Sequence, residues 1–121
     1  MMDELGKLGE DAATRWLEAH GHSILSRNWR GGHVELDIVT LNHEGIHFVE
    51  VKSRKAPVMA DPAVNVDGSK RRHLVQAAGK WLRGNPQFGA HELFFDILTV
   101  IFDHTDTLIN YYPQAFIPTY A

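Results

Sequence analysis

Residues 33–53 read HVELDIVTLNHEGIHFVEVKS, and this stretch decides the fold. Apolar and polar side chains alternate on both sides of Asn-His-Glu-Gly at 42–45, a pattern typical of two strands joined by a tight turn. Alternate side chains of a strand share a face, so Val34, Leu36 and Ile38 are expected on one side of the first strand. The sequence thus predicts a β-hairpin whose first strand has one apolar and one acidic face.

The turn sets which residues face each other across this hairpin. An even-length loop centred within 42–45 places Asp37 opposite Glu50 and Glu35 opposite Lys52, because the register of a hairpin follows from its turn. Directly opposed side chains have Cβ atoms about 5 Å apart. Three carboxylates and one ammonium group are therefore expected on one face of the sheet.

Two opposed carboxylates repel each other, so Asp37 and Glu50 need a positive charge beside them. A hard divalent cation with oxygen ligands, Mg²⁺ or Mn²⁺, meets this need, and the backbone carbonyl of Val51 is a further candidate ligand. Lys52 would then orient or help deprotonate an attacking water and steady the charge on a phosphate. Metal-dependent hydrolysis of phosphodiester bonds requires this combination of groups.

A structural interpretation of the same residues stays open. Glu35 and Lys52 are also what a cross-strand ion pair needs. Asp37 is equally able to pair with an arginine, either Arg30 or Arg54. The spacing alone does not separate this interpretation from the metal site.

The flanking segments supply two helices and the remaining strands. A chain of 121 residues predicts a single domain over 1–121. Periodicity and the Gly and Pro breaks give the order α-β-β-β-α-β-β, which predicts two helices on a mixed sheet. The expected elements are a helix over 3–20, strands over 23–30, 33–41 and 46–53, a loop over 54–67, a helix capped by Ser69 and ending at Gly84, and strands over 93–102 and 107–112.

Glu10 lies at the border of the apolar stripe of the first helix. It precedes Leu17 by seven residues, so the two side chains are about 20° apart on the helical wheel. From there its carboxylate is able to reach the sheet face that carries Asp37 and Glu50. The simpler alternative for Glu10 by itself is a solvated position on the helix.

Composition predicts a soluble cytoplasmic protein. Hydrophobic residues make up 44% and charged residues 22% of the chain, which is typical of a globular domain. The lack of cysteine fits a reducing compartment and excludes disulfides and thiolate metal sites. The charged N-terminus is unlike a signal peptide, and the apolar stretch 93–102 is too short to span a membrane. A net charge of −3 excludes nucleic-acid binding through bulk positive charge.

Basic side chains gather near the acidic segments. Lys70, Arg71 and Arg72 open the second helix, where cations oppose the helix dipole. Arg54 and Lys55 directly follow the third strand. Sequence-independent contacts with the phosphates of a nucleic acid explain this placement, and so does simple solubility. The loop that leads from one group to the other favours the phosphate interpretation.

Other polar residues receive structural interpretations. Asp96, in an otherwise apolar strand, is expected to be a buried and hydrogen-bonded carboxylate, with an outer position in the same site as the alternative. The eight histidines lack the spacing of metal ligands and are expected at the surface or in turns.

Asp37 followed by Glu50-Val51-Lys52 resembles the motif of the PD-(D/E)xK nuclease superfamily, an acid followed by an (Asp/Glu)-x-Lys tripeptide on the next strand. Over nearly the whole chain, the pattern is also similar to the uncharacterised bacterial YraN-like family. The chain departs from that family at Phe94-Phe95-Asp96, where Arg-Phe-Asp is frequent. The matching segments are Leu8-Gly9-Glu10-Asp11-x-Ala13, Asn28-Trp29-Arg30, Glu35-Leu36-Asp37, 48–54, Lys70 and Ala115-Phe116.

The resemblance implies a restriction-endonuclease-like α-β-β-β-α-β core, here with an extra C-terminal strand. It implies a Mg²⁺-dependent endonuclease that acts on DNA, including branched or structured DNA of the kind that resolvases of the superfamily cleave. Asp37 and Glu50 would hold the metal and Lys52 would serve the water. Glu10 would be an additional metal-site acid, and Glu35 would support the site.

Two other classes of function stay open. One is a non-catalytic nucleic-acid-binding protein or adaptor on the same fold. The other is an interaction module whose apolar tail, 111–120, docks a partner or a second copy in a homodimer.

Overall fold

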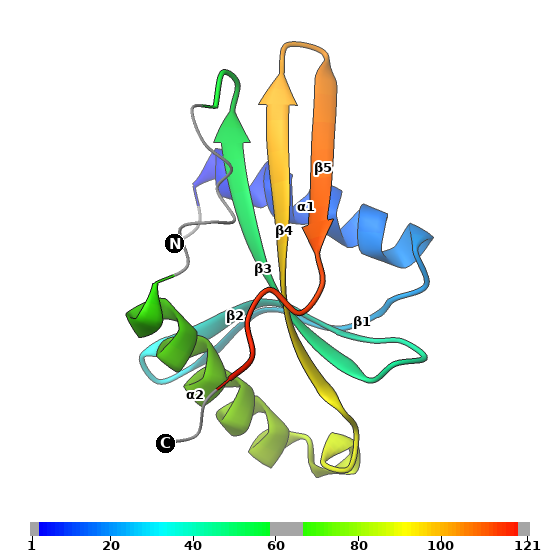
Figure 1. Ribbon diagram of the computed structural model, residues 1–121, viewed down its shortest axis with the longest axis vertical. Coiled ribbons are helices and arrows are strands. Elements are labelled where there is room, and N and C mark those ends of the chain that lie inside the picture. Colours follow the sequence, from blue (N-terminus) through cyan, green and yellow to red (C-terminus); the bar gives the residue numbers. More distant parts are fainter. Residues whose placement is uncertain (1–2, 59–66, 119–121) are drawn as a thin grey trace.

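The described part of the chain forms two α-helices, a short 3-10 turn and a five-stranded sheet, in the predicted order. The computed structural model describes residues 3–58 and 67–118 (Figure 1). Neighbouring strands follow the order β1-β2-β3-β4-β5, with β3 and β4 parallel and the other pairs antiparallel. The predicted mixed α+β fold is confirmed. Its elements are α1 (Glu4–Ala19), β1 (Ser23–Gly31), β2 (Val34–Leu41), β3 (Ile46–Lys55), α2 (Gly68–Gly84), η2 (Pro86–Phe88), β4 (Leu93–Asp103) and β5 (Asp106–Tyr112).

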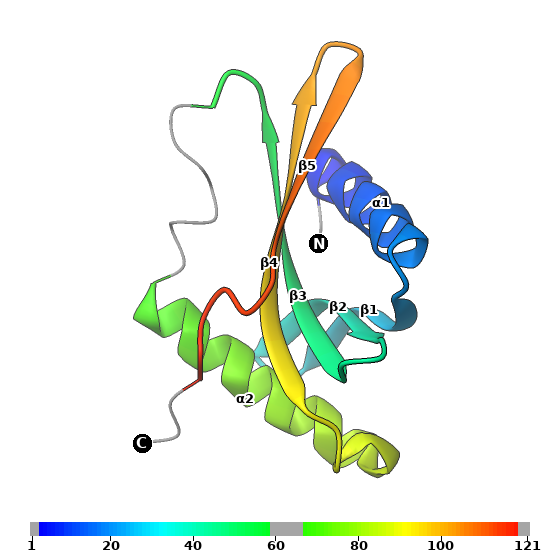
Figure 2. The same ribbon diagram turned by 45° about the vertical axis from the view of Figure 1, so that its right-hand side comes forward.

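The two α-helices cover opposite faces of the sheet, which we call the α1 face and the α2 face (Figure 2). On the α1 face, Ala13 and Leu17 are fully buried against strand residues that include Val49. On the α2 face, the Trp81 ring meets Phe48 edge-on, with 6.0 Å between ring centroids. Ala13, Leu17 and Trp81 therefore lie on the sides of the two helices that meet the sheet, whereas Leu8 of α1 is 50% exposed. Among the helices described, none is long and apolar enough to cross a membrane.

Side-chain caps fix where both α-helices begin. Asp3 accepts a hydrogen bond from the Gly6 N–H at 2.7 Å, and Asp67 accepts one from the Lys70 N–H at 2.8 Å. The expected cap at Ser69 was wrong, because the carboxylate of Asp67 reaches the free N–H groups first and also favours the helix dipole.

The third strand is longer than expected and includes Arg54 and Lys55, while residues 59–66 of the expected loop lie outside the described residues.

The β2–β3 hairpin has the predicted register. Its four pairs run from Leu41↔Ile46 at the turn to Ile38↔Val49. Beyond that point β3 continues beside β4 as far as Lys55. Figure 1 shows β3 and β4 running on after β2 has turned away. The sheet therefore forks between β2 and β3 just where the acidic segments begin.

The fork coincides with an irregularity in β1 and β2. Leu36 packs in the cluster on the α2 face, whereas Ile38 packs in the cluster on the α1 face. The expectation that Val34, Leu36 and Ile38 share a face was therefore wrong for Ile38. The β1–β2 pairing skips Asn28 and Asp37, which lie between the pairs Arg27↔Ile38 and Trp29↔Leu36. Asn28 has a φ of 50°, a left-handed conformation that Asn tolerates better than most residues.

Helix α1 approaches β3 very closely at Gly9. A Cβ atom added at Gly9 would lie 1.7 Å from Ser53 Oγ and 2.7 Å from Ser53 Cβ. Because the space for a side chain is already filled, Gly9 permits the contact that holds the start of α1 against β3. This contact also places the next residue, Glu10, beside the fork.

Asp96 is the centre of a buried polar cluster on the α1 face. It accepts hydrogen bonds from His47 Nδ1 at 2.6 Å, from the Gln114 N–H at 2.9 Å and from the Tyr111 hydroxyl. Burial and the bond to Asp96 raise the pKa of Tyr111. The structural interpretation of Asp96 is confirmed. The surface placement expected for the histidines was wrong for His47 and His22, which are 2% and 7% exposed.

The segment after β5 contributes to the protein's own core. Phe116 is 7% exposed and its ring lies 5.1 Å from that of Phe95. Ile117, in contrast, is 83% exposed. The expected docking tail is therefore partly used within the fold, and its residues 119–120 lie outside the described residues.

Candidate acidic site at the strand fork

Asp37 and Glu50 meet at the point where β2 leaves β3. Their carboxyl groups are in hydrogen-bonding contact. Asp37 Oδ2 also accepts a hydrogen bond from the backbone N–H of Val51 at 2.9 Å, just past the last pair of the β2–β3 ladder. The Asp37 side chain thus takes the place of the missing strand neighbour of Val51. The structure therefore brings together the two carboxyl groups that the turn register predicted to meet.

The pair is electrostatically unfavourable. Burial, and then the neighbouring Glu50 carboxylate, raise the pKa of Asp37 well above its ordinary value of 3.8, while the Val51 N–H acts in the opposite direction. Two carboxyl groups in contact resist ionising together because each charge destabilises the other. A cation placed between them would relieve this repulsion.

Lys70 already supplies one cation to this pair. Its Nζ lies 2.9 Å from Glu50 Oε1, and the Glu50 side chain is only 11% exposed. Burial works to lower the pKa of Lys70, but Glu50, followed by Asp37 and Glu35, outweighs burial and raises it. Lys70 was expected to face a nucleic acid, whereas the structure directs its ammonium group towards the acids at the fork.

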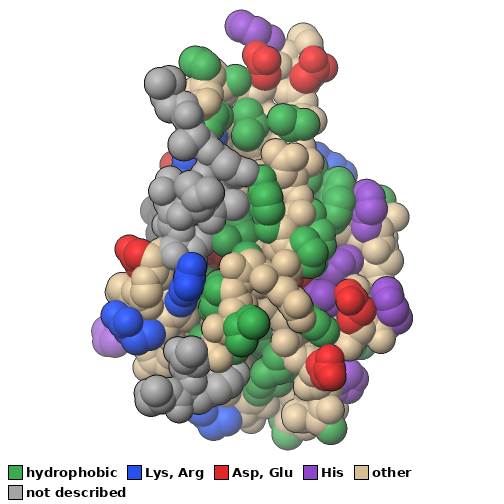
Figure 3. All heavy atoms as spheres, in the orientation of Figure 1, with side chains coloured by type: hydrophobic (Ala, Val, Ile, Leu, Met, Phe, Trp, Pro, Cys, Tyr) green, Lys and Arg blue, Asp and Glu red, His purple; other side chains and the backbone are tan. Residues whose placement is uncertain are grey.

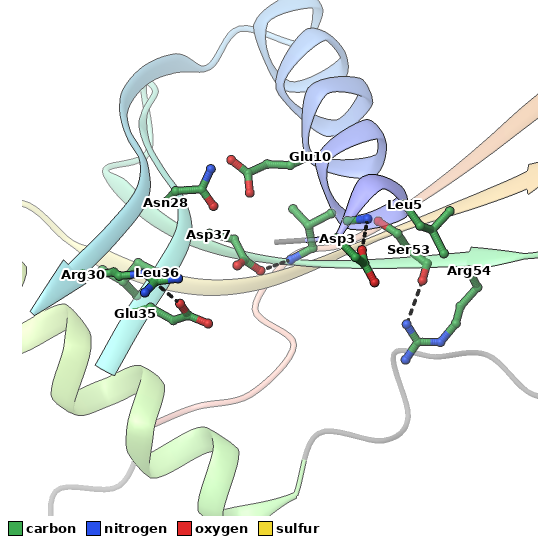
Figure 4. A pocket seen from close by; sticks show the side chains of 12 residues that line it. Asp3, Leu5, Glu10, Asn28, Arg30, Glu35, Leu36, Asp37, Ser53 and Arg54 are labelled. Carbon is green, nitrogen blue, oxygen red and sulfur yellow. Dashed lines mark hydrogen bonds and ion pairs between the residues drawn. The ribbon is translucent and has the colours of Figure 1, made fainter. Parts of the chain in front are cut away.

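A cavity of about 320 Å³ opens beside Asp37 (Figure 4). It lies between the start of α1 and the forked ends of β2 and β3. Figure 4 shows Asp37 near its centre, with Glu10 and Asn28 on one side and Glu35 and Arg30 on another. The cavity is therefore bordered by acids of α1, its N-cap Asp3 and β2. Its lining residues are Asp3, Leu5, Gly6, Glu10, Asn28, Arg30, Glu35, Leu36, Asp37, Val51, Ser53 and Arg54.

Glu10 is buried in the wall of this cavity. It is 2% exposed, so the solvated alternative was wrong. Arg27 explains how the carboxylate is tolerated, because its guanidinium donates to Glu10 at 3.2 Å and to Asp11 at 2.6 Å. Burial raises the pKa of Glu10 above 4.5, and the bond from Arg27 counteracts this rise. Glu10 thus faces the same cavity as Asp37, but Arg27 already balances its charge.

Glu35 and Lys52 lie beyond the end of the β2–β3 ladder. Glu35 lines the cavity and lies 3.5 Å from Arg30, its partner on β1, with both side chains more than half exposed. Lys52 pairs in register with Thr99 of β4. By alternation it shares the α2 face of β3 with Glu50, two residues before it. The ladder therefore does not extend to the predicted pairing of Glu35 with Lys52.

The other basic residues surround the fork at different distances from its centre. Arg54 lines the cavity, and Lys55 is exposed at the end of β3. On α2, Arg71 lies over the Phe116 ring, 5.5 Å from its centroid, and Arg72 is exposed. In Figure 3, Lys and Arg side chains gather at the lower left, over α2. Arg54, Lys55 and Arg72 are all exposed, so they suit contacts with a polyanion.

The donor groups at the fork fit a hard divalent cation. Asp37 and Glu50 offer carboxylate oxygens, and the C=O of Val51 lies on the same edge of β3 as its N–H, towards the fork. Mg²⁺ commonly binds one or two carboxylates and keeps several waters. Within 3–58 and 67–118, no three His, Asp or Glu side chains are close enough to form a metal site by themselves. Such an ion would therefore depend on the carboxylate pair, a backbone oxygen and water.

Sequence reasoning missed three groups of this site. Arg27 lies on the strand opposite Glu10, and no local spacing connects the two residues. The kink at Asn28 was visible only as an Asn-Trp-Arg segment next to two glycines. The inward turn of Lys70 had a usable signal, because a lysine in the first helical turn opposes the dipole and needs a nearby acid.

The fold and the site together define a class: a mixed α+β domain with a carboxylate pair at a strand fork. Residues 9–100 match the family described as "Uncharacterised protein family UPF0102", so the chain belongs to that family. The predicted YraN-like family is thereby confirmed.

The relatives cover most of the chain. A UPF0102 protein of Bacteroides thetaiotaomicron is 40% identical over 123 residues, which span 96% of this chain and 94% of the relative. One from Bifidobacterium longum is 38% identical over 115 residues, 93% of each chain. One from Oleidesulfovibrio alaskensis is 49% identical over 80 residues, 66% of this chain and 40% of the relative. The family relationship thus extends across both halves of the acidic site.

Proposed function

We propose that this chain is a divalent-metal-dependent endonuclease that hydrolyses phosphodiester bonds of DNA, with branched or structured DNA as its substrate. The observation that carries the proposal is the contact between the Asp37 and Glu50 carboxyl groups beside an open cavity. Two carboxyl groups in contact destabilise a fold when both are ionised, whereas a metal-dependent hydrolase uses such a pair to hold its ion. The resemblance to PD-(D/E)xK nucleases supports the same reading by analogy.

Each residue at the fork has a role in this proposal. Asp37, Glu50 and the Val51 carbonyl would hold Mg²⁺ or Mn²⁺, which when bound would neutralise phosphate charge and make water a better nucleophile. Lys52 would hold the phosphate and orient or deprotonate the attacking water. Glu10 and Glu35 would support the site from the cavity wall.

The remaining cations would position the nucleic acid. Arg54 and Lys55 lie at the end of β3, and Arg71 and Arg72 lie on the first turns of α2. Contacts from these side chains to phosphates would carry no base information, so they suit a protein that reads the shape of its substrate. Their number would set how steeply binding falls with salt.

The test is cleavage of a panel of linear, flapped and four-way DNA substrates with Mg²⁺ or Mn²⁺. We expect cleavage by the wild-type chain and none by Asp37→Asn or Lys52→Ala. Arg83→Ala is the matched control, because it removes a cation near the far end of α2 and should cleave normally. If the wild-type chain cleaves no substrate with either metal, the proposed activity is wrong.

A second candidate is a non-catalytic nucleic-acid-binding protein or adaptor. The contact between Lys70 and Glu50 favours it, because an acid already satisfied by lysine has less need of a metal. This candidate predicts DNA binding that survives Lys52→Ala and is insensitive to divalent cations. Binding without cleavage in the same panel would select it.

A further inference from the structure

We propose that Lys70 is an internal counter-cation of the Asp37–Glu50 pair and that a divalent ion displaces it on binding. This inference rests on the proposed metal site and adds a built-in competitor to it. The consequence is that the affinity of the site for metal is set by two cations that need the same carboxylates.

The position of Lys70 is the first reason. Its ammonium lies 2.9 Å from Glu50 Oε1 and is attracted by Asp37 and Glu35 as well. Its backbone is fixed, because Asp67 accepts the Lys70 N–H at 2.8 Å. Its side chain is nevertheless 42% exposed, so the ammonium has solvent beside it into which to move. The backbone of Lys70 is thus held in place, while its ammonium group has room to leave Glu50 for solvent.

The comparison with its neighbours on α2 is the second reason. Arg71 lies over the Phe116 ring, and Arg72 is exposed. A lysine in the first turn of a helix opposes the dipole, so the inward position of Lys70 needs compensation, which the acids at the fork provide. Lys70 therefore differs from Arg72, whose side chain is exposed.

The chemistry of exchange follows from these contacts. An ammonium group and a divalent ion both relieve the repulsion between Asp37 and Glu50, but the divalent ion does so with twice the charge. Because Oε1 of Glu50 is occupied by Lys70, the metal must share that carboxylate or expel the ammonium. An expelled ammonium remains tethered beside the site, where a phosphate group would take it up. Removal of Lys70 should therefore strengthen binding of the metal alone.

The experiment is isothermal titration of Mn²⁺ into the full chain without nucleic acid. The variants are Lys70→Ala, Lys70→Gln and the control Arg72→Ala, which removes a cation from the same helical turn. We expect both Lys70 variants to bind Mn²⁺ about threefold to fivefold more tightly than wild type, the upper part of the range for loss of a partly exposed ion pair. Arg72→Ala should stay within about twofold, because exposed charges are screened.

Thermal unfolding supplies a readout that is independent of the titration. Without metal, Lys70→Ala should melt about 2–5 °C below wild type, because the acid pair loses its cation. At saturating Mn²⁺ this difference should disappear. A loss of stability that persists with Mn²⁺ would mean that Lys70 supports the fold only, and it would overturn the exchange.

The outcomes separate this inference from the proposed function. Equal or weaker Mn²⁺ binding by the Lys70 variants, with normal binding by wild type, would overturn the exchange and leave the metal site standing. If Lys70→Ala and Arg72→Ala gained equally in affinity for Mn²⁺, net charge alone would explain the effect, and the exchange would also be overturned. If neither wild type nor any variant binds Mn²⁺, the metal site and the exchange are both wrong.

Discussion

Asp96 and Asp37 are two carboxyl groups within the same sheet, and their surroundings are opposite. Asp96 faces three donors, from His47, Tyr111 and the backbone of Gln114. Asp37 faces one backbone donor and a second carboxyl group. The first arrangement satisfies its charge within the fold. The second leaves Asp37 against another carboxyl group beside a cavity, with Lys70 paired to Glu50 as the compensating cation. A buried acid surrounded by donors stabilises a protein, and a buried acid facing another acid indicates a ligand.

The largest effect is expected for Asp96→Asn, which keeps the shape of the side chain and replaces one oxygen by a donor. An amide N–H₂ would then face groups that also donate, so a buried charge and its hydrogen bonds are lost together. We expect a loss of roughly 3 kcal/mol or more of unfolding free energy. Urea denaturation followed by circular dichroism measures it. A loss below about 1 kcal/mol would show that the cluster around Asp96 contributes little.

The second largest effect is expected at Gly9→Ala, where α1 meets β3 next to Glu10 of the cavity wall. The new Cβ would lie 1.7 Å from Ser53 Oγ, so α1 or β3 must shift. Overpacking of this kind costs about 1–3 kcal/mol. Gly79→Ala is the matched control, because its Cβ would lie 3.6 Å from the Arg83 side chain, an ordinary contact, within α2. We expect Gly79→Ala to be neutral or stabilising by up to about 1 kcal/mol.

Asp37→Asn should have the opposite sign from Asp96→Asn, although the chemical change is the same. An amide at position 37 removes the repulsion with Glu50 and still accepts the Val51 N–H. We expect a gain of roughly 1–2 kcal/mol for the metal-free chain at pH 7. The same variant should lose any stabilisation by Mn²⁺. A loss of stability at pH 7 would contradict the claim that repulsion between Asp37 and Glu50 destabilises the folded chain.

The gain from Asp37→Asn should depend on pH in a defined direction. The pKa of Asp37 is raised in the folded chain, so the folded state holds this proton more tightly than the unfolded state. The stabilising effect of the proton is full below the ordinary value of 3.8 and is lost as the pH rises through the raised pKa. The variant should therefore match wild type in acid and exceed it near neutrality.

The same two regions show what the sequence is able to predict. The order of elements, the β2–β3 register and the meeting of Asp37 with Glu50 all follow from local alternation and one turn. Local rules succeed there because the two strands are adjacent in sequence. The buried environment of Asp96 was also predictable, since a lone acid in an apolar strand must find donors.

The failures concern contacts between distant segments. The change of face at Ile38 coincides with the unpaired positions Asn28 and Asp37 between β1 and β2. Arg27 meets Glu10 only after α1 has packed on the sheet. His47 was expected at the surface, but its strand is central and Asp96 lies on the neighbouring strand. Tertiary packing decides these positions, so periodicity within one segment carries no signal for them.

The smallest effect in this comparison is expected at Arg30→Ala, on the open rim of the cavity. Arg30 and Glu35 lie 3.5 Å apart, but their side chains are 64% and 60% exposed. Water and salt screen such a pair, so its loss should change the unfolding free energy by no more than about 0.5 kcal/mol. The measurement is urea denaturation at low and high salt, and a loss that persists at high salt would show that Arg30 has a packing role. A small value would show where charge stops affecting the stability of the fold. Charge at Asp37 would matter to the fold, whereas charge at Glu35, two residues earlier on β2, would be left for contacts with a ligand.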